Sequence, residues 1–299
     1  MRIVVALGGN ALLRRGERPE AQTQHRRVHE AILAIAAATA GHELVVVHGN
    51  GPQVGMLALE SSSDPALERP YPLGDLTAET QGLIGHWIAE AFGAAAPVRA
   101  AAALISHVVV DPADPAFGHP TKPIGPLMTA GQARTAHRRW GWAFAPDGTA
   151  MRRVVASPSP LELVEAPAAE ALLASRCIPI VGGGGGIAVT ARGEQIDAVI
   201  DKDLVAAMIG IRLGADRLVI LTDVEAVVDG YGTPGARPLT GPSSTTELRA
   251  MAFAAGSMGP KVDAACRFAE ATGGVAAIGA LDDAAAVIAG TAGTQVVRG

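Results

Sequence analysis

Aromatic residues, lysine and cysteine are all scarce in this chain of 299 residues. Aromatic side chains make up only 3% of the sequence, although hydrophobic residues reach 49%. A chain of this length can bury a sizeable core, and that core must be built from Ala, Val, Ile and Leu. The abundance of alanine and glycine favours helices packed closely on a sheet.

Long apolar runs and an excess of basic charge are missing as well. The formal net charge is -5, and no basic stripe indicates a nucleic-acid surface. No apolar run reaches the roughly 18 residues that a membrane-spanning helix requires. The apolar opening, residues 1–13, has only Arg2 before the run and turns at Gly8-Gly9, which is typical of a first strand rather than a signal peptide. We therefore expect no nucleic-acid or membrane partner.

The two cysteines, Cys177 and Cys266, are far apart in sequence, and each lies among apolar residues. This pattern predicts reduced thiols in the core of a cytoplasmic protein. Two cysteines are too few for a zinc site of their own.

The lysines are distinctive because only three of the 24 basic residues are lysine: Lys122, Lys202 and Lys261. Arginine is used everywhere else, so a preference for arginine acts along the whole chain. A site that needs a compact ammonium group cannot accept the wide planar guanidinium instead. Two interpretations follow. The lysines are either chance surface residues or three point charges that bind a polyanion.

The apolar pattern alternates short β-branched runs with longer Ala- and Leu-rich stretches. The first half predicts strands over 3–7 and 43–48, with helices over 20–40, from Pro52 onward and over 77–92, followed by one or two strands in 100–110. The second half predicts helices over 166–175, 201–211, 245–255 and 260–271 and strands over 178–181, 216–222, 275–278 and 294–297. Such alternation predicts an α/β fold with a mainly parallel sheet, whose ligands bind at the carboxyl ends of the strands.

Residues 111–160 interrupt this alternation. They are rich in proline, glycine, histidine and arginine, and their apolar runs are short. We interpret them as a small subdomain that leaves the core.

Two glycine turns follow the first two predicted strands: Gly8-Gly9-Asn10 and His48-Gly49-Asn50-Gly51. Glycine allows backbone N–H groups to approach an anion, and a helix start adds positive potential. The alternative is a pair of ordinary tight turns. His48 is either catalytic or, as we favour, a residue that holds the loops together by hydrogen bonds.

Five consecutive glycines, 182–186, raise the question of dinucleotide binding. Gly183, Gly185 and Ala188 fit the spacing G-x-G-x-x-A, and Asp203 lies 20 residues beyond Gly183. That motif requires a helix directly after the turn, whereas residues 187–190 predict a strand. NAD binding is therefore disfavoured. The chain also has no P-loop motif and no spacing typical of metal ligands.

Asp201-Lys202-Asp203 places a cation between two carboxylates at a predicted helix start. Asp201 is a candidate N-cap, and the group is either a surface ion pair or a lysine whose position is fixed by Asp203. Lys261 follows the glycine-rich segment 256–260, which suits a phosphate. The strand-end loop 221–232 is either a support for a nucleotide base and ribose or an ordinary surface loop.

In order and through nearly the whole chain, these segments resemble the carbamate kinases of the amino acid kinase family. The similarity is carried by residues 5–12, 48–55, 80–82, 109–114, 121–126, the glycine run, 198–203 and 256–261. The segment Thr121-Lys122-Pro123-Ile124-Gly125-Pro126 is the most specific of them.

The resemblance implies a three-layer αβα sandwich with a mainly parallel eight-stranded sheet. The whole chain, 1–299, would form one domain with a protruding lid at 111–160, an N-terminal acceptor-binding part and a nucleotide-binding part at 177–299. It also implies a cytoplasmic homodimer that uses ATP or ADP with Mg²⁺. Its reaction would be reversible phosphoryl transfer between ATP and carbamate, often in the direction of ATP synthesis from carbamoyl phosphate and ADP, within arginine metabolism.

The resemblance assigns roles to particular residues. The catalytic group would be Lys122, Lys202, Asp203 and Lys261, with Asp203 organising two of the lysines. The acceptor and transferred phosphoryl group would be bound by Gly8, Gly9, Asn10, Asn50 and Gly51. The nucleotide would be bound by Thr222, Asp223, Tyr231, Gly232, Ser257 and Met258.

The sequence departs from the family pattern around the lid. The departures are Gly74 in place of Asp, Thr149-Ala150-Met151-Arg152 in place of Arg-Gly-Trp-Arg, and Ala156 and Ala188 in place of Pro. They leave phosphoryl transfer as the prediction but raise the question of the acceptor. The alternatives are a kinase for another small carboxylate or phosphate acceptor, a nucleotide sensor without catalysis and, least favoured, an NAD-dependent dehydrogenase.

Overall fold

The computed structural model describes residues 1–9, 12–13, 17–97, 99–253 and 258–299. Its largest sheet contains β1 (Arg2–Leu7), β2 (Glu43–His48), β3 (Ala101–Ala103), β9 (Ile178–Ile180), β11 (Arg217–Thr222), β14 (Gly241–Ser244), β15 (Val275–Ala280) and β16 (Thr294–Val297). The strand order is β14-β16-β15-β11-β1-β2-β9-β3. Every neighbouring pair is parallel except β15 and β16. The predicted α/β fold with a mainly parallel eight-stranded sheet is confirmed.

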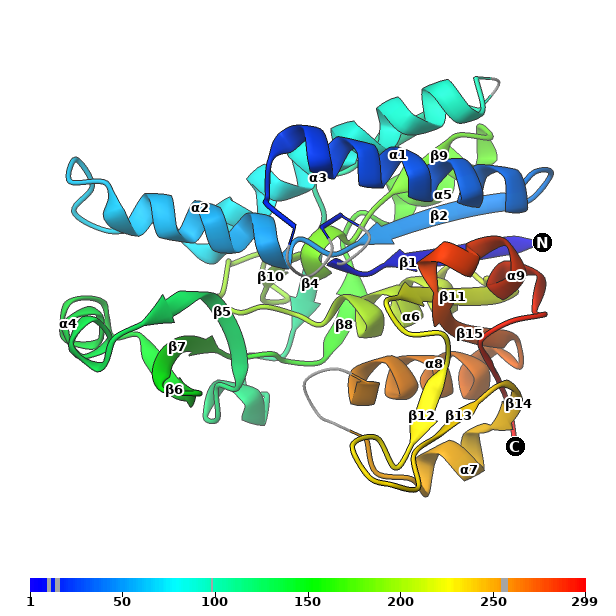
Figure 1. Cartoon of the computed structure of the whole chain (residues 1–299). Helices are drawn as coiled ribbons and strands as arrows, with labels where there is room; N and C mark the ends of the chain where they lie inside the picture. Colours follow the sequence, from blue (N-terminus) through cyan, green and yellow to red (C-terminus); the bar gives the residue numbers. More distant parts are fainter. Residues whose placement is uncertain (10–11, 14–16, 98, 254–257) are drawn as a thin grey trace.

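Helices cover both faces of this sheet (Figure 1). One layer contains α1 (Ala21–Ala38), α3 (Leu73–Ala95) and α9 (Ala284–Ala289), and the other contains α5 (Ala166–Ala174), α6 (Lys202–Arg212), α7 (Thr245–Arg249) and α8 (Met258–Thr272). Side chains alternate along β1: Ile3 and Val5 pack in the first layer, and Val4 packs in the second. Because β1 is buried on both faces, nearly all of its residues are apolar, and this explains the apolar run near the start of the chain.

Shorter elements surround the large sheet. A second sheet joins β4 (His107–Val110), β8 (Pro160–Leu163) and β10 (Ile187–Val189), and a hairpin joins β12 (Val227–Asp229) to β13 (Arg237–Leu239). The remaining helical elements are α2 (Gly51–Ser63), η2 (Pro115–Phe117), η3 (Gly183–Gly185) and η4 (Leu281–Asp283). No helix in the described part of the chain is long and apolar enough to cross a membrane.

A small antiparallel sheet projects from this body (Figure 1). We call residues 122–155 the lid sheet; its strands are β5 (Lys122–Met128), β6 (Ala143–Asp147) and β7 (Ala150–Val155), in the order β5-β7-β6. The helix α4 (Ala130–Trp140) connects β5 to β6 and begins with a capping box of Thr129 and Gln132. The lid sheet falls inside the predicted excursion, although the subdomain boundaries at 111 and 160 remain a prediction.

Two sequence predictions need correction, and one strand of the large sheet was not predicted. The helix predicted for 245–255 ends at Arg249 as α7, and the last two of these residues lie outside the described part. Cys266 is buried, as predicted, but Cys177 is only half-buried. The edge strand β14 was missed because it contains Pro242 and Gly241, residues that weaken a strand signal but that an edge strand tolerates.

Candidate active site

The ends of three parallel strands bring the predicted glycine turns together. Leu7 pairs in register with His48 on one side and with Leu221 on the other. The chain then turns, and Gly8 N donates to Leu221 O at 3.0 Å while Gly49 N donates to Leu7 O at 2.9 Å. The turns after β1, β2 and β11 therefore lie side by side at the carboxyl edge of the sheet, as expected for a ligand site in this class of fold.

The glycine run lies against the turn after β2. Gly184 has a φ of +65°, and a Cβ atom placed on it would lie 2.2 Å from Asn50 Nδ2. Both the conformation and the space therefore require glycine. The run continues into β10, which confirms the predicted strand and removes the helix that the dinucleotide motif requires.

Two buried polar residues of α3 hold these loops in place. Asn50 Nδ2 donates to Thr80 Oγ1 at 2.8 Å. Gln81 exchanges hydrogen bonds with the backbone of Ser106, and Ser106 Oγ accepts a hydrogen bond from Gly182 N at 2.9 Å. Thr80 and Gln81 thus orient Asn50 and the glycine run from behind. The sequence supplied them only as part of a family motif, with no indication of this role.

His48 packs inside the loops, and the structure favours the holding role over catalysis. Its Nδ1 lies 2.9 Å from Gly49 O. Burial lowers the pKa of His48 to about 4, opposed by its hydrogen bond to Gly49 and assisted by the charge of Lys202. The ring is therefore neutral near pH 7 and fills the space beside Gly183, where a Cβ atom would lie 2.5 Å from Nε2.

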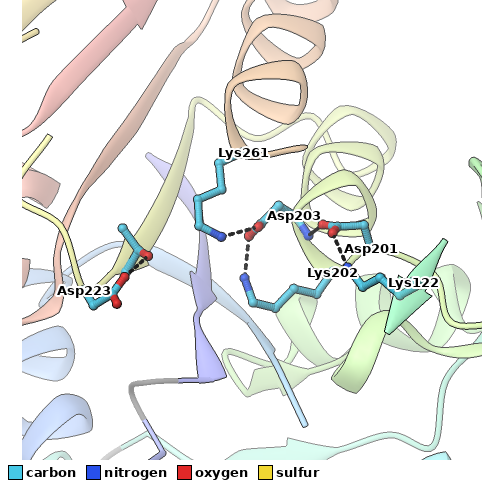
Figure 2. A network of polar contacts seen from close by, with 7 residues as sticks. Lys122, Asp201, Lys202, Asp203, Asp223 and Lys261 are labelled. Carbon is cyan, nitrogen blue, oxygen red and sulfur yellow. Dashed lines mark hydrogen bonds and ion pairs between the residues drawn. The ribbon is translucent and has the colours of Figure 1, made fainter. Parts of the chain in front are cut away.

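Asp203 joins two of the predicted catalytic lysines (Figure 2). Its carboxylate lies in the first turn of α6, 2.5 Å from Lys202 Nζ and 2.8 Å from Lys261 Nζ. Burial alone would raise the pKa of Asp203, but the two ammonium groups outweigh it and lower the pKa to about 2. The buried carboxylate is therefore ionised at neutral pH.

The side chain of Lys202 extends past Gly49 toward the anion-binding turns. A Cβ atom on Gly49 would lie 3.4 Å from Cδ and Cε of Lys202, so the lysine stem occupies the space next to that residue. Burial lowers the pKa of Lys202, while the neighbouring Asp203 opposes this change. The stem of Lys202 therefore packs directly beside the turn that follows β2.

Asp201 does more than the predicted capping. One carboxylate oxygen accepts a hydrogen bond from Asp203 N at 2.9 Å, which confirms it as the N-cap of α6. The other oxygen lies 2.8 Å from Nζ of Lys122, the first residue of β5 in the lid sheet. Sequence reasoning missed this ion pair, because nothing in a local pattern connects positions 79 residues apart.

The three lysines line one cavity of about 650 Å³ together with Gly9, Asn50 and Gly51. Asp201, Asp203 and Gly184 also line it, and so does Arg152, which the sequence indicated only as the last residue of the altered segment 149–152. Apolar residues of α2 and β5 form its outer walls: Val54, Met56, Leu59, Pro123, Ile124 and Pro126. Gly8 does not line the cavity, although the next residue, Gly9, does, and Asn10 falls outside the described residues.

The predicted nucleotide residues lie elsewhere. Thr222 ends β11, and its Oγ1 donates to Asp223 Oδ1 at 3.1 Å. In Figure 2, Lys261 lies between Asp223 on one side and Lys122 on the other. Tyr231, which is 81% exposed, and Gly232 connect β12 to β13, and Met258 begins α8. None of these five lines the cavity, and Ser257 falls outside the described residues. The nucleotide assignment remains a prediction.

The carboxylates of the cavity do not form a metal cage. The described residues contain no group of three or more histidine, cysteine, aspartate or glutamate side chains placed to hold an ion. Asp201 and Asp203 are each bound to lysine. A Mg²⁺ ion at this site would thus fit best with most of its ligands coming from nucleotide phosphates and water.

Known proteins share this architecture and sequence. A model of the amino acid kinase family matches residues 1–279. The chain is 45% identical to a carbamate kinase of Rhizobium meliloti (strain 1021), over 99% of this chain and 93% of that protein. It is 44% identical to a carbamate kinase of Escherichia coli O6:H1, over 98% of each. The structure of a carbamate kinase from Giardia lamblia bound to AMP-PNP matches with a TM-score of 0.90 and 35% identity, covering 100% of this chain and 98% of the other.

The fold and the lysine-lined cavity thus agree with a phosphotransferase of the kinase class, whose members use ATP or ADP. The chain belongs to the amino acid kinase family and, within it, to the carbamate kinases. The family resemblance predicted from the motifs is confirmed.

Proposed function

We propose that this protein catalyses reversible phosphoryl transfer between ATP and carbamate, with formation of ATP from carbamoyl phosphate and ADP as one direction. The observation that carries the proposal is the convergence of Lys122, Lys202 and Lys261 on one cavity. Arginine serves almost everywhere else in the chain, so lysine at these three positions indicates a need for compact charges.

The lysines address the main obstacle to the reaction, which is repulsion between two anionic reactants. The three ammonium groups exceed the carboxylates of Asp201 and Asp203 by one positive charge, and the guanidinium group of Arg152 adds a second to the cavity lining before substrates bind. Each ammonium has three donors, so a lysine that donates to a carboxylate can still donate to phosphoryl oxygens. Phosphoryl transfer is accelerated mainly by positioning and by neutralising charge on the moving group, which is what these groups supply.

The acceptor needs no general base in this mechanism. A carbamate oxygen is already ionised, and His48 is neutral and does not line the cavity. Gly9 and Gly51 do line it, and Gly51 begins α2. Backbone N–H groups at such a helix start attract an anion, so we place the acceptor and the transferred phosphoryl group beside Asn50.

The nucleotide belongs on the other side of the lysines in this proposal. Thr222, Asp223, Tyr231, Gly232, Ser257 and Met258 would bind it, with Mg²⁺ carried on its phosphates. This arrangement puts Lys261 between the nucleotide and the acceptor. We further propose that the enzyme acts as a cytoplasmic homodimer in arginine metabolism.

A second candidate acceptor is another small carboxylate. A cavity of about 650 Å³ is large enough for a drug-sized ligand, and carbamate has only four heavy atoms. Met56 and Leu59 line part of this cavity, and the carbon chain of a longer carboxylate would contact these apolar side chains.

The test uses the purified chain with carbamoyl phosphate and Mg-ADP, and ATP formation is followed by a coupled assay. Acetyl phosphate and other acyl phosphates form the comparison panel. The proposal expects ATP from carbamoyl phosphate at least about tenfold faster than from any other donor. Faster transfer from another acyl phosphate would assign the acceptor to that class instead, and no transfer from any donor by a folded, ADP-binding protein would favour a sensor.

A further inference from the structure

Asp201 occupies an unusual position between the two parts of the molecule. It precedes α6 in the main body, whereas its partner Lys122 begins β5 in the lid sheet. Nζ of Lys122 lies 2.8 Å from Oδ2 of Asp201, and both residues line the cavity (Figure 2). The ion pair therefore connects the lid to the main body inside the site itself.

The carboxylate of Asp201 has a fixed orientation. Oδ1 accepts a hydrogen bond from the backbone N–H of Asp203, so the capping geometry of α6 determines where Oδ2 points. The Asp201 side chain is 13% exposed, compared with 32% for Lys122. A buried, oriented acceptor that holds a more exposed lysine differs from a surface ion pair, in which both partners are free to move.

The ion pair also divides the lysines between two carboxylates. Asp203 holds Lys202 and Lys261 from the main body, and Asp201 holds Lys122 from the lid sheet. Among the described residues, Lys122 forms its ion pair with Asp201 alone. Without it, the ammonium group at the end of four rotatable bonds would have no fixed place beside the cavity.

We propose that Asp201 is a positioning residue that holds the lid lysine Lys122 at the reaction centre. The proposal rests on the proposed function, because it gives Asp201 a role in the same phosphoryl transfer. Lys122 donates one N–H to Asp201 and keeps two for the phosphoryl oxygens. The cap of α6 thereby aligns the lid lysine with the two lysines of the main body, and misplacement by about 1 Å would slow transfer strongly.

The variant Asp201→Asn separates positioning from capping. Asparagine is as good an N-cap as aspartate, so α6 keeps its cap while the charge that attracts Lys122 is lost. We expect kcat for ATP formation to fall about tenfold or more, with a small change in the thermal midpoint. In a Lys122→Ala background the same change should reduce kcat less than about twofold, because the lysine to be positioned is gone.

Asp197→Asn is the matched control. Asp197 also joins the lid sheet to the main body, through a 3.0 Å ion pair with Arg153, but it does not line the cavity or contact a catalytic lysine. We expect this variant to keep most of the kcat. If Asp197→Asn slowed the reaction as much as Asp201→Asn, general attachment of the lid would explain the effect, and the positioning role would be wrong.

A second measurement is independent of turnover. Since the chain has three lysines, NMR of the protein with labelled lysine gives three sets of side-chain signals, each assigned by one Lys→Arg variant. The proposal expects the Lys122 ammonium signal to be protected from exchange in the wild type and lost in Asp201→Asn. An unchanged Lys122 signal, or kcat effects that simply multiply in the double variant, would overturn it. A wild type that forms no ATP would contradict the proposed function instead, and the lysine signals would still decide whether Asp201 holds Lys122.

Discussion

The main body and the lid sheet supply lysines to the same cavity in different ways. Lys202 and Lys261 are 13% and 16% exposed and share the almost fully buried carboxylate of Asp203. Lys122 is 32% exposed, and the apolar cluster at the base of the lid sheet contains only Leu73, Ile124 and Val155, with Val199 packed against it. The two cavity lysines of the main body are thus part of the packed interior, whereas the single lysine from the lid sheet is more exposed.

This difference separates stability from catalysis in the lid sheet and couples them in the main body. A change at the buried charges disturbs both the fold and the reaction, because an unpaired charge in the interior is costly. A change at the more exposed Lys122 should disturb the reaction far more than the fold.

Asp203→Ala should have the largest effect. It leaves the ammonium groups of Lys202 and Lys261 buried without their shared partner. We expect a loss of about 3–5 kcal/mol in the free energy of unfolding, measured by urea denaturation, together with loss of ATP formation.

The control for this variant is Asp263→Ala, which removes a carboxylate that pairs with Arg249 and Arg267 on the surface of α8. It should cost less than about 1 kcal/mol. Equal stability losses for the two variants would show that the buried cluster is not specially coupled to the fold.

His48→Gln tests how the buried histidine of the main body affects the pH dependence of stability. The folded pKa of about 4 lies below the ordinary 6.5, so the unfolded state binds a proton first as the pH falls. The contribution of His48 to stability is complete above pH 6.5 and is lost between pH 6.5 and about 4, by up to about 3 kcal/mol. The urea midpoint should therefore decline less over this range in His48→Gln than in the wild type.

His29→Gln, at an exposed position of α1, controls for the loss of a histidine. Identical declines of the urea midpoint in the wild type and in His48→Gln would contradict the proposed effect of burial on His48.

Gly184→Ala and Gly214→Ala form a pair that tests how finely the loops of the main body are placed. Both glycines have positive φ, but a Cβ atom on Gly184 meets Asn50 at 2.2 Å and one on Gly214 meets nothing within 4 Å. Each variant should lose about 1–2 kcal/mol from the backbone conformation alone. Only Gly184→Ala should also reduce kcat/KM, by about tenfold, because it displaces Asn50 from Thr80. Equal kinetics in the two variants would show that the position of Asn50 is not critical.

Much of the fold could be predicted from the sequence because the signals are local. The buried strands, the helix cap at Asp201 and the strand after the glycine run all follow from short patterns. The three lysines stood out because arginine replaces lysine elsewhere. By contrast, β14 was hidden by proline and glycine, and α7 was predicted too long because its sequence continues to favour a helix after Arg249.

The contacts that complete the site could not be predicted in the same way. The pair of Lys122 with Asp201, the support of Asn50 by Thr80 and the position of Arg152 in the cavity all join segments far apart in the chain. Their geometry depends on tertiary packing, to which a local pattern is insensitive. The nucleotide assignment remains a prediction for the related reason that it came from the family resemblance alone.

If lysines from the main body and from the lid sheet act on the same phosphoryl group, Lys122→Ala should slow the reaction. The most direct measurement is its rate of ATP formation from carbamoyl phosphate and Mg-ADP. We expect a fall of about 100-fold or more in kcat, with a loss in the free energy of unfolding well below the about 3–5 kcal/mol of Asp203→Ala, because Lys122 is 32% exposed. A rate close to that of the wild type would mean that the lid lysine takes no part in the transfer, and it would contradict the account.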